Sequence, residues 1–188
     1  LKYLDVLTAV SPTATNYVRT LTDRKIAIVP NGIDLKKYHN GNSDKPVKGK
    51  KTILYVGRLE KRKGVKYLLS AYSILKHAHP EYELVIAGDG PDREKLESQV
   101  KEFGIQDVRF LGYIEESTKL QLLQEATLFC SPALYGESFG IVLLEAMASG
   151  CVTVAGNNVG FLPGLSSPLP ARSHRPSPLP HALHLEHR

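Results

Sequence analysis

The chain has 188 residues and a net charge of +5, and hydrophobic residues make up 42% of it. These values argue against a disordered chain, a collagen and a disulfide scaffold, and favour a soluble globular protein. No run approaches the ~18 apolar residues of a membrane span. The chain opens with neither Met nor a signal peptide, so we expect a fragment. Cys130 and Cys151 lie in apolar runs and are expected to be buried free thiols of a cytosolic protein.

Two apolar segments near the amino terminus are predicted strands. Residues 4–11 form the first, followed by a helix through Arg19, and residues 26–34 form the second, which ends in an Asn-Gly turn. Residues 36–51 are polar and Lys-rich, as in a linker or surface loop. Between residues 36 and 66, eleven Lys or Arg stand against two acids. A nucleic-acid or membrane patch would have this charge, but no stacking aromatics interleave it, and a solvated loop plus a phosphate site explains it equally.

From residue 50 to 156, short apolar runs alternate with longer amphipathic ones. Strands are predicted at 52–59, 82–88, 108–114, 127–132 and 151–156. Helices are predicted between them at 65–76, 92–104, 117–126 and 139–150. This alternation predicts an α/β fold, a Rossmann-like parallel sheet with helices on both faces. Ligands of such sheets bind at the carboxyl ends of the strands, so the functional residues should lie just after each strand.

A basic turn follows the first of these strands and reads Gly-Arg-Leu-Glu-Lys-Arg-Lys-Gly over residues 57–64. Gly57 allows the backbone to approach a ligand closely. Arg58 leaves the strand end and Lys63 precedes the next helix, so the two cations would form a diphosphate cradle. A solvated basic turn explains the same residues.

Two glutamates mark the stretch from Tyr135 to Ala146. Glu137 lies at a loop-to-helix junction, and Glu145 follows eight residues later, about two helical turns on. Burying Glu145 in an apolar helix is costly unless it is paired or bound to something. Sugar and ribose hydroxyls suit two carboxylates and the free N–H groups of residues 139–141. The alternative is that Glu145 is only a partly exposed or ion-paired helix residue.

Together these motifs resemble the C-terminal, nucleotide-sugar-binding half of the retaining glycosyltransferases of family 4, which have the GT-B fold. The matching motifs follow in order across residues 29–156: PNGID, GRLEKRKG, AGDGP, FLGYI, and the Glu-x7-Glu pair followed by AMASG. The stretch from GYIEESTK through GESFGIVLLEAMASG is most similar to the phosphatidylinositol α-mannosyltransferases. The five-residue interval from Arg58 to Lys63 is usual in the family, but one residue shorter than expected for those enzymes.

The resemblance implies a role for each residue of the donor site. Arg58 and Lys63 would hold the diphosphate beside Gly57, with help from Arg62, and Glu145 would bind the ribose. Glu137 would hold the transferred sugar, and Glu137, Arg58 and Lys63 would be the catalytic residues. The sugar would also contact the residues after Glu137, which are Ser138, Phe139, Gly140 and Ile141.

The loop after the third strand would read the base in these mannosyltransferases. Here it offers the backbone of Ile114 and the side chains of Glu116 and Lys119. A carboxylate suits guanine, whose N1–H and N2–H₂ groups are donors. The sequence contains no Asp-x-Asp motif, which fits a leaving-group site without a metal.

The implied enzyme is a retaining hexosyltransferase that needs no metal and no cofactor besides its donor substrate. It would move mannose from GDP-mannose to a lipid or glycan acceptor, in the cytoplasm and at the inner face of the cell membrane. Membrane association would come from an amino-terminal domain absent here, and no nucleic-acid partner is expected. A UDP-sugar enzyme and a non-catalytic nucleotide-sugar-binding module remain as alternatives.

The resemblance divides the chain into three parts. Residues 1–28 would be a remnant of the acceptor domain with its linker, and residues 29–160 the nucleotide-sugar-binding domain. Residues 161–188 hold six of the twelve Pro and four of the seven His and predict a disordered, non-homologous tail. With half of the active site missing, this fragment is expected to be inactive alone.

Overall fold

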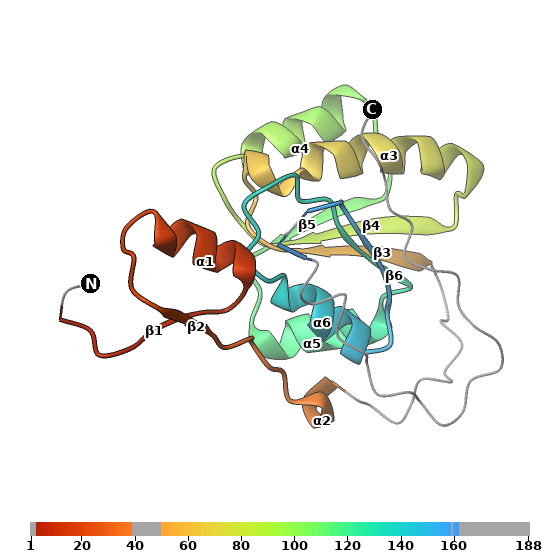
Figure 1. Cartoon of the computed structure of the whole chain (residues 1–188). Coiled ribbons are helices and arrows are strands. Elements are labelled where there is room, and N and C mark those ends of the chain that lie inside the picture. Colours follow the sequence, from red (N-terminus) through yellow and green to blue (C-terminus); the bar gives the residue numbers. More distant parts are fainter. Residues whose placement is uncertain (1–2, 39–49, 159, 162–188) are drawn as a thin grey trace.

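A five-stranded sheet forms the centre of the protein in the computed structural model, which describes residues 3–38, 50–158 and 160–161 (Figure 1). Its strands are β3 (Lys51–Val56), β4 (Tyr82–Ala87), β5 (Val108–Gly112), β6 (Leu128–Ser131) and β7 (Val152–Ala155). They lie in the order β5-β4-β3-β6-β7, and each neighbouring pair is parallel. The predicted parallel sheet is confirmed.

Helices cover both faces of this sheet (Figure 1). One face carries α3 (Val65–Ala78) and α4 (Arg93–Glu102), and the other carries α5 (Glu116–Glu125) and α6 (Ile141–Ala148). A hydrophobic core lies on each face of the sheet, and successive strand residues point alternately into one core and the other. Ile53 and Tyr55 pack with α3, whereas Leu54 packs with α6. Because both faces are covered, the strands are nearly continuous apolar runs.

The order of the strands reverses beside β3. The chain runs outward from β3 through β4 to β5, then returns to the other side of β3 and continues through β6 to β7. The carboxyl ends of β3 and β6 therefore mark the topological switch point, where open α/β sheets bind ligands. The segments that leave these two strands, residues 57–64 and 132–140, meet there.

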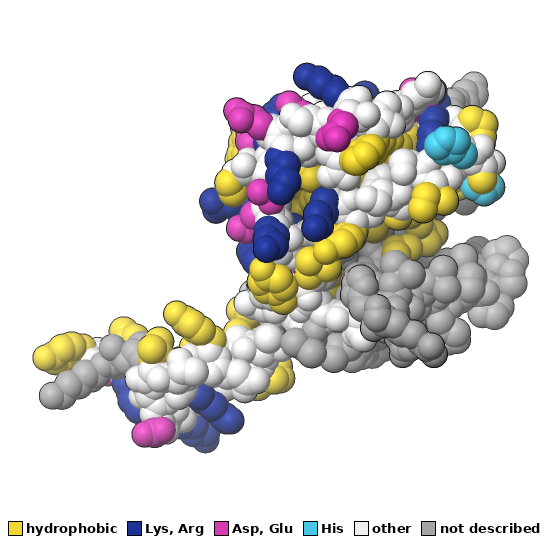
Figure 2. Space-filling model, turned by 90° about the horizontal axis from the view of Figure 1, so that it is seen from above, with side chains coloured by type: hydrophobic (Ala, Val, Ile, Leu, Met, Phe, Trp, Pro, Cys, Tyr) yellow, Lys and Arg dark blue, Asp and Glu magenta, His cyan; other side chains and the backbone are white. Residues whose placement is uncertain are grey.

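A small amino-terminal unit lies beside the main sheet. It consists of β1 (Leu7–Ala9), α1 (Pro12–Arg19) and β2 (Ile26–Ile28), with β1 and β2 paired in parallel. Ser11 caps α1, and its buried hydroxyl also donates a hydrogen bond to the backbone carbonyl of Ser138. Figure 2 shows this unit projecting from the main body with apolar side chains on its surface.

A short helix, α2 (Leu35–Tyr38), begins in the segment predicted to be a linker. The Asp34 carboxylate accepts a hydrogen bond from the Lys36 amide at 3.0 Å and so starts the turn. Tyr38 is 4% exposed and packs in the core against α6. The prediction of a loop was therefore wrong for residues 36–38, and residues 39–49 lie outside the described part of the chain.

The helix predicted at 139–150 begins later, at Ile141. Gly140 has φ 75° and ψ 47°, a left-handed conformation that ends the preceding loop rather than continuing a helix. Glu137 consequently precedes the helix by four residues. The prediction that Glu137 lies at the junction is kept, but the spacing of about two helical turns to Glu145 does not hold, because residues 137–140 are not helical.

The carboxyl end of the described chain packs onto the same loop. Phe161, the first residue of the predicted tail, is 1% exposed and belongs to the core on the α6 side. A side chain at Gly160 would overlap the backbone carbonyl of Glu137, so only glycine fits this approach. Residues 162–188 lie outside the described part of the chain.

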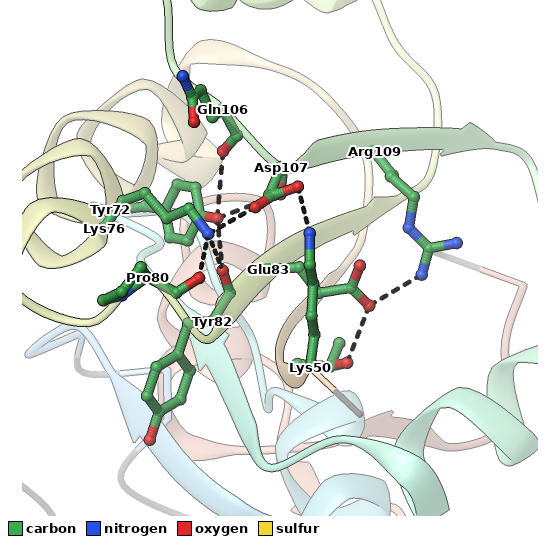
Figure 3. A network of polar contacts seen from close by, with 10 residues as sticks. Lys50, Tyr72, Lys76, Pro80, Tyr82, Glu83, Gln106, Asp107 and Arg109 are labelled. Atoms are coloured by element: carbon green, nitrogen blue, oxygen red, sulfur yellow. Dashed lines mark hydrogen bonds and ion pairs between the residues drawn. The ribbon is translucent and has the colours of Figure 1, made fainter. Parts of the chain in front are cut away.

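A polar clasp, formed by Lys50, Tyr72, Lys76 and Asp107, ties the amino-terminal ends of the strands together (Figure 3). Asp107 accepts hydrogen bonds from Lys50 and Lys76, both at 2.5 Å. The buried Tyr72 hydroxyl donates to the carbonyl oxygen of Asp107 at 3.1 Å. The clasp fastens the turn before β5 to α3, at the end of the sheet opposite the switch point.

Candidate functional site

The turn that leaves β3 places two cations at the switch point. Residues Lys61–Lys63 form a short 3-10 helix, which ends at Gly64 with φ 69°. A side chain at Gly64 would overlap the carbonyl of Pro132, directly after β6. The turn therefore lies against the chain leaving β6, and only glycine allows this approach.

Arg62 and Lys63 both bind Glu137, across the gap between the two strand ends. The Lys63 ammonium forms a short ion pair with Glu137 Oε1, and Arg62 Nη1 lies 3.4 Å from the same oxygen. Arg62 also donates to the carbonyl oxygen of Gly136 at 2.8 Å and pairs with Glu60 at 2.7 Å. The Glu137 side chain is only 12% exposed. The structure thus brings together three of the predicted donor-site residues.

Arg58 has a different environment from the other two cations. Its side chain is 68% exposed, and its nearest recorded carboxylate oxygen, on Glu60, is 3.9 Å away. The backbone is better fixed, because the Tyr55 hydroxyl donates to the Arg58 carbonyl at 3.0 Å. Arg58 therefore offers a largely exposed guanidinium at the end of β3.

Glu145 is buried on α6 and carries a charge-assisted network. It is 6% exposed, and its Oε1 accepts hydrogen bonds from the Tyr38 hydroxyl and the Lys119 ammonium, each at 2.9 Å. Burial, together with the hydrogen bond to Glu145, raises the pKa of Tyr38. Burial opposes the charge on Lys119, yet its bonds to Glu145 and Glu116 leave its pKa raised. Two donors thus satisfy one oxygen of this buried carboxylate.

The predicted base-reading residues surround the same network. Ile114 is half-buried at the end of the loop after β5. Glu116 is 53% exposed and pairs with Lys37 at 2.8 Å and Lys119 at 2.9 Å. Hydrogen bonds from Lys37 and then Lys119 hold the pKa of Glu116 at about 2. Glu116 and Glu145 thus share Lys119 as a common partner.

The loop before α6 leads the chain from Glu137 to the helix. Ser138 is exposed and Phe139 is buried, whereas Gly140 packs under the ring of Phe161. Within the described residues, no hydrogen bond is recorded from the amides of Phe139, Gly140 or Ile141. These N–H groups at the start of α6 can therefore donate to a ligand.

Two residues of this site, Tyr38 and Lys37, escaped the sequence analysis. Both lie in the polar stretch interpreted as a linker. Asp34 was the available signal, because an Asp at this spacing often begins a helix. Glu60, which anchors Arg62, was noted only as part of the basic turn.

Other kinds of site find little support in the described residues. None of their His, Cys, Asp and Glu side chains gather in threes as a metal site would require. Within the same residues, no helix is both long and apolar enough to cross a membrane. Cys130 and Cys151 are free, and burial raises their pKa values to about 11 and about 12.

Comparison with known proteins identifies the family. The model of the family described as "Glycosyl transferases group 1" matches residues 40–168. The chain belongs to the group 1 glycosyl transferases. This confirms the resemblance to family 4 and its GT-B fold, which rested on the motifs alone. The switch-point residues described above are thus those of a group 1 glycosyl transferase.

Two curated relatives show how far the similarity extends. Phosphatidyl-myo-inositol mannosyltransferase of Mycolicibacterium smegmatis is 38% identical over 136 residues, which cover 71% of this chain and 34% of that protein. Glycogen synthase of Mycobacterium tuberculosis is 36% identical over 139 residues, covering 73% and 33%. The chain therefore spans about a third of the length of these group 1 relatives.

A solved structure shows the same fold. HepE of Anabaena, in complex with UDP and glucose, superimposes with a TM-score of 0.74 at 23% identity. The match covers 88% of this chain and 48% of HepE. The fold of this chain therefore corresponds to about half of the HepE chain.

Proposed function

We propose that this chain is the donor-binding part of a retaining hexosyltransferase that transfers mannose from GDP-mannose to a lipid or glycan acceptor. One observation carries the proposal: Arg62 and Lys63 meet Glu137 at the switch point between β3 and β6. Cations from one strand end and a carboxylate from the other suit a ligand that has both phosphates and hydroxyls.

The charges of the site suit the departure of a diphosphate. Negative charge grows on the leaving diphosphate as the bond to the anomeric carbon breaks, and preorganised cations stabilise it. Lys63 and the exposed Arg58 would supply this charge without a metal ion. A phosphate that binds Lys63 would release Glu137 from its ion pair, so that its carboxylate can accept hydroxyls of the sugar. Configuration at the anomeric carbon would be retained.

The choice of guanine rests on Glu116 and on the mannosyltransferase relative. Guanine presents two adjacent N–H donors, and a carboxylate can accept a hydrogen bond from each. Uracil has no such pair of donors. The carboxylate of Glu116 is half exposed at the edge of the Glu145 network. Two comparisons favour other donors, since HepE was solved with UDP and glucose and another relative is a glycogen synthase. The base and the sugar are therefore the first features to test.

The proposal extends to the organisation of the whole protein. Residues 1–28 would belong to the acceptor domain and residues 29–160 to the donor domain, whose core also includes Phe161. A separate tail would follow. Exposed apolar side chains on the amino-terminal unit fit a surface that another domain covers; they are Tyr3, Val6, Tyr17 and Leu21. The enzyme would act in the cytoplasm at the inner face of the cell membrane.

Calorimetric titration of the chain with GDP, GDP-mannose and UDP-glucose tests this proposal. We expect the two guanine nucleotides to bind and UDP-glucose to bind at least about tenfold more weakly, because one charge-assisted hydrogen bond is worth about 1.5–3 kcal/mol. Glu116→Gln should abolish the preference, whereas Glu94→Gln on the far helix should keep it. If UDP-glucose bound more tightly than GDP-mannose, the donor would be a UDP-sugar and the assignment of GDP-mannose would be wrong. Failure of every nucleotide to bind would refute the proposal.

A further inference from the structure

The buried contact between Tyr38 and Glu145 joins two distant parts of the sequence. Tyr38 ends α2, just after the PNGID motif, and Glu145 lies in the middle of α6. Tyr38 is 4% exposed and Glu145 is 6% exposed, and the phenol oxygen lies 2.9 Å from the carboxylate Oε1. A hydroxyl placed in an apolar core needs a partner, and here the partner is the carboxylate that the sequence predicts to bind the ribose.

The two oxygens of the Glu145 carboxylate have different hydrogen-bond partners. Oε1 accepts from Tyr38 and from Lys119, each at 2.9 Å. Among residues 3–38, 50–158 and 160–161, no contact to Oε2 is recorded. Two donors on one oxygen fix the rotation of the carboxylate and leave the second oxygen for a ligand. A diol binds best to a carboxylate that is already held in this way.

We propose that Tyr38 is a positioning residue for the nucleotide, which holds Glu145 in the orientation that accepts the ribose hydroxyls. This rests on the proposed function, in which Glu145 binds the ribose. It adds α2 to the donor site, although no atom of Tyr38 need touch the ligand. The PNGID segment would then act on binding through the turn that delivers Tyr38 to the core.

Tyr38→Phe keeps the ring and removes only the hydroxyl, so it tests the proposal with little change in packing. The chain would be titrated with GDP and with 2′,3′-dideoxy-GDP, which lacks the ribose hydroxyls. We expect Tyr38→Phe to bind GDP about tenfold more weakly than the unaltered chain does. The two chains should bind dideoxy-GDP with the same affinity. A residue with a merely structural role would affect both nucleotides alike.

Tyr72→Phe is the matched control. Tyr72 is equally buried, but its hydroxyl donates to backbone carbonyls in the clasp at the opposite end of the sheet (Figure 3). This variant should lose stability and keep the ratio of GDP to dideoxy-GDP affinity. In Glu145→Gln, the added Tyr38→Phe change should weaken GDP binding no further, because the two residues act as one unit.

The outcomes separate the two levels of the proposal. Equal weakening of both nucleotides by Tyr38→Phe, or no weakening of either, would overturn the positioning role and leave the donor site standing. If the unaltered chain bound GDP and dideoxy-GDP equally, Glu145 would not bind the ribose and the positioning role would fall with it. If it bound neither, the proposed function itself would be refuted.

Discussion

At the scale of single residues, the side chains of the proposed donor site differ most in their ion pairs. Lys63 is 20% exposed and neutralises Glu137, whereas Arg58 is 68% exposed and only loosely associated with Glu60. Removing Lys63 would leave a nearly buried carboxylate without its main partner and so disturb the fold. Arg58 is therefore the better probe of phosphate binding, because its loss leaves no buried charge unpaired.

Arg58→Ala should weaken GDP binding without loss of stability. We expect GDP affinity to fall by about 10- to 100-fold, the value of a charge-assisted hydrogen bond. The binding of guanosine, which has no phosphate, should not change. The free energy of unfolding should stay within about 0.5 kcal/mol of the original, as for other surface positions. Calorimetry gives the affinities and urea denaturation gives the stability.

Arg109→Ala supplies the matched control for that prediction. Arg109 is also exposed and also faces a carboxylate, Glu83 at 3.1 Å, but it belongs to β5 near the clasp (Figure 3). Arg109→Ala and Arg58→Ala each remove one positive charge from the chain. The general electrostatic attraction of the chain for GDP would therefore fall equally in both variants. Equal losses of GDP affinity in the two variants would show that Arg58 makes no specific contact.

At the scale of elements, the clasp holds the turn between α4 and β5 against α3. Asp107 has φ 56°, a left-handed conformation that few residues other than Gly, Asn and Asp adopt. Its carboxylate accepts hydrogen bonds from the Lys50 and Lys76 ammonium groups. These hydrogen bonds lower the pKa of Asp107 from 3.8 to about 2. The element boundary thus depends on one residue that is both conformationally tolerant and charged.

Asp107→Asn should remove a pH-dependent part of the stability. The folded-state pKa lies below the ordinary value of 3.8, so the ion pairs stabilise the fold above that pH and are lost as pH falls towards about 2. Asn keeps the left-handed turn but not the charge. The variant should be less stable at pH 7, and the difference from the original chain should shrink between pH 4 and pH 2.

Urea denaturation across this pH range measures the effect. Asp92→Asn is the control, because Asp92 precedes α4 but makes no capping hydrogen bond through its side chain. A stability difference for Asp107→Asn that stayed constant between pH 7 and pH 2 would show that the carboxylate charge does not contribute to the clasp.

The elements of the main sheet follow from the sequence because each strand is a continuous apolar run bounded by turn residues. The ends of helices are harder to predict where a glycine adopts a left-handed conformation. Gly140 stops the loop from joining α6, and nothing in the apolar pattern of residues 139–150 distinguishes it from a helical residue. The clasp and α2 depend on contacts between distant segments, such as Tyr38 with Glu145, which no local pattern encodes.

At the scale of the whole molecule, the reversal of strand order makes one site from separate motifs. Arg58 and Lys63 follow β3, whereas Glu137 follows β6, and these strands are neighbours only in the folded sheet. The motifs in the sequence point to these residues, but the direct pairing of Lys63 with Glu137 appears only in the fold. The buried Ser11, whose hydroxyl donates to the carbonyl of Ser138, also links the amino-terminal unit to this loop.

The location of nucleotide binding is the central claim, and a titration of the ¹⁵N-labelled chain with GDP, followed by NMR, tests it most directly. We predict that the amide signals of residues 57–64 and 137–145 shift together and saturate at one GDP per chain. Signals of the clasp around Lys76 and Asp107, at the other end of the sheet, should remain in place. Shifts confined to the clasp, or no saturable shift at residues 57–64 and 137–145, would contradict a donor site at the switch point.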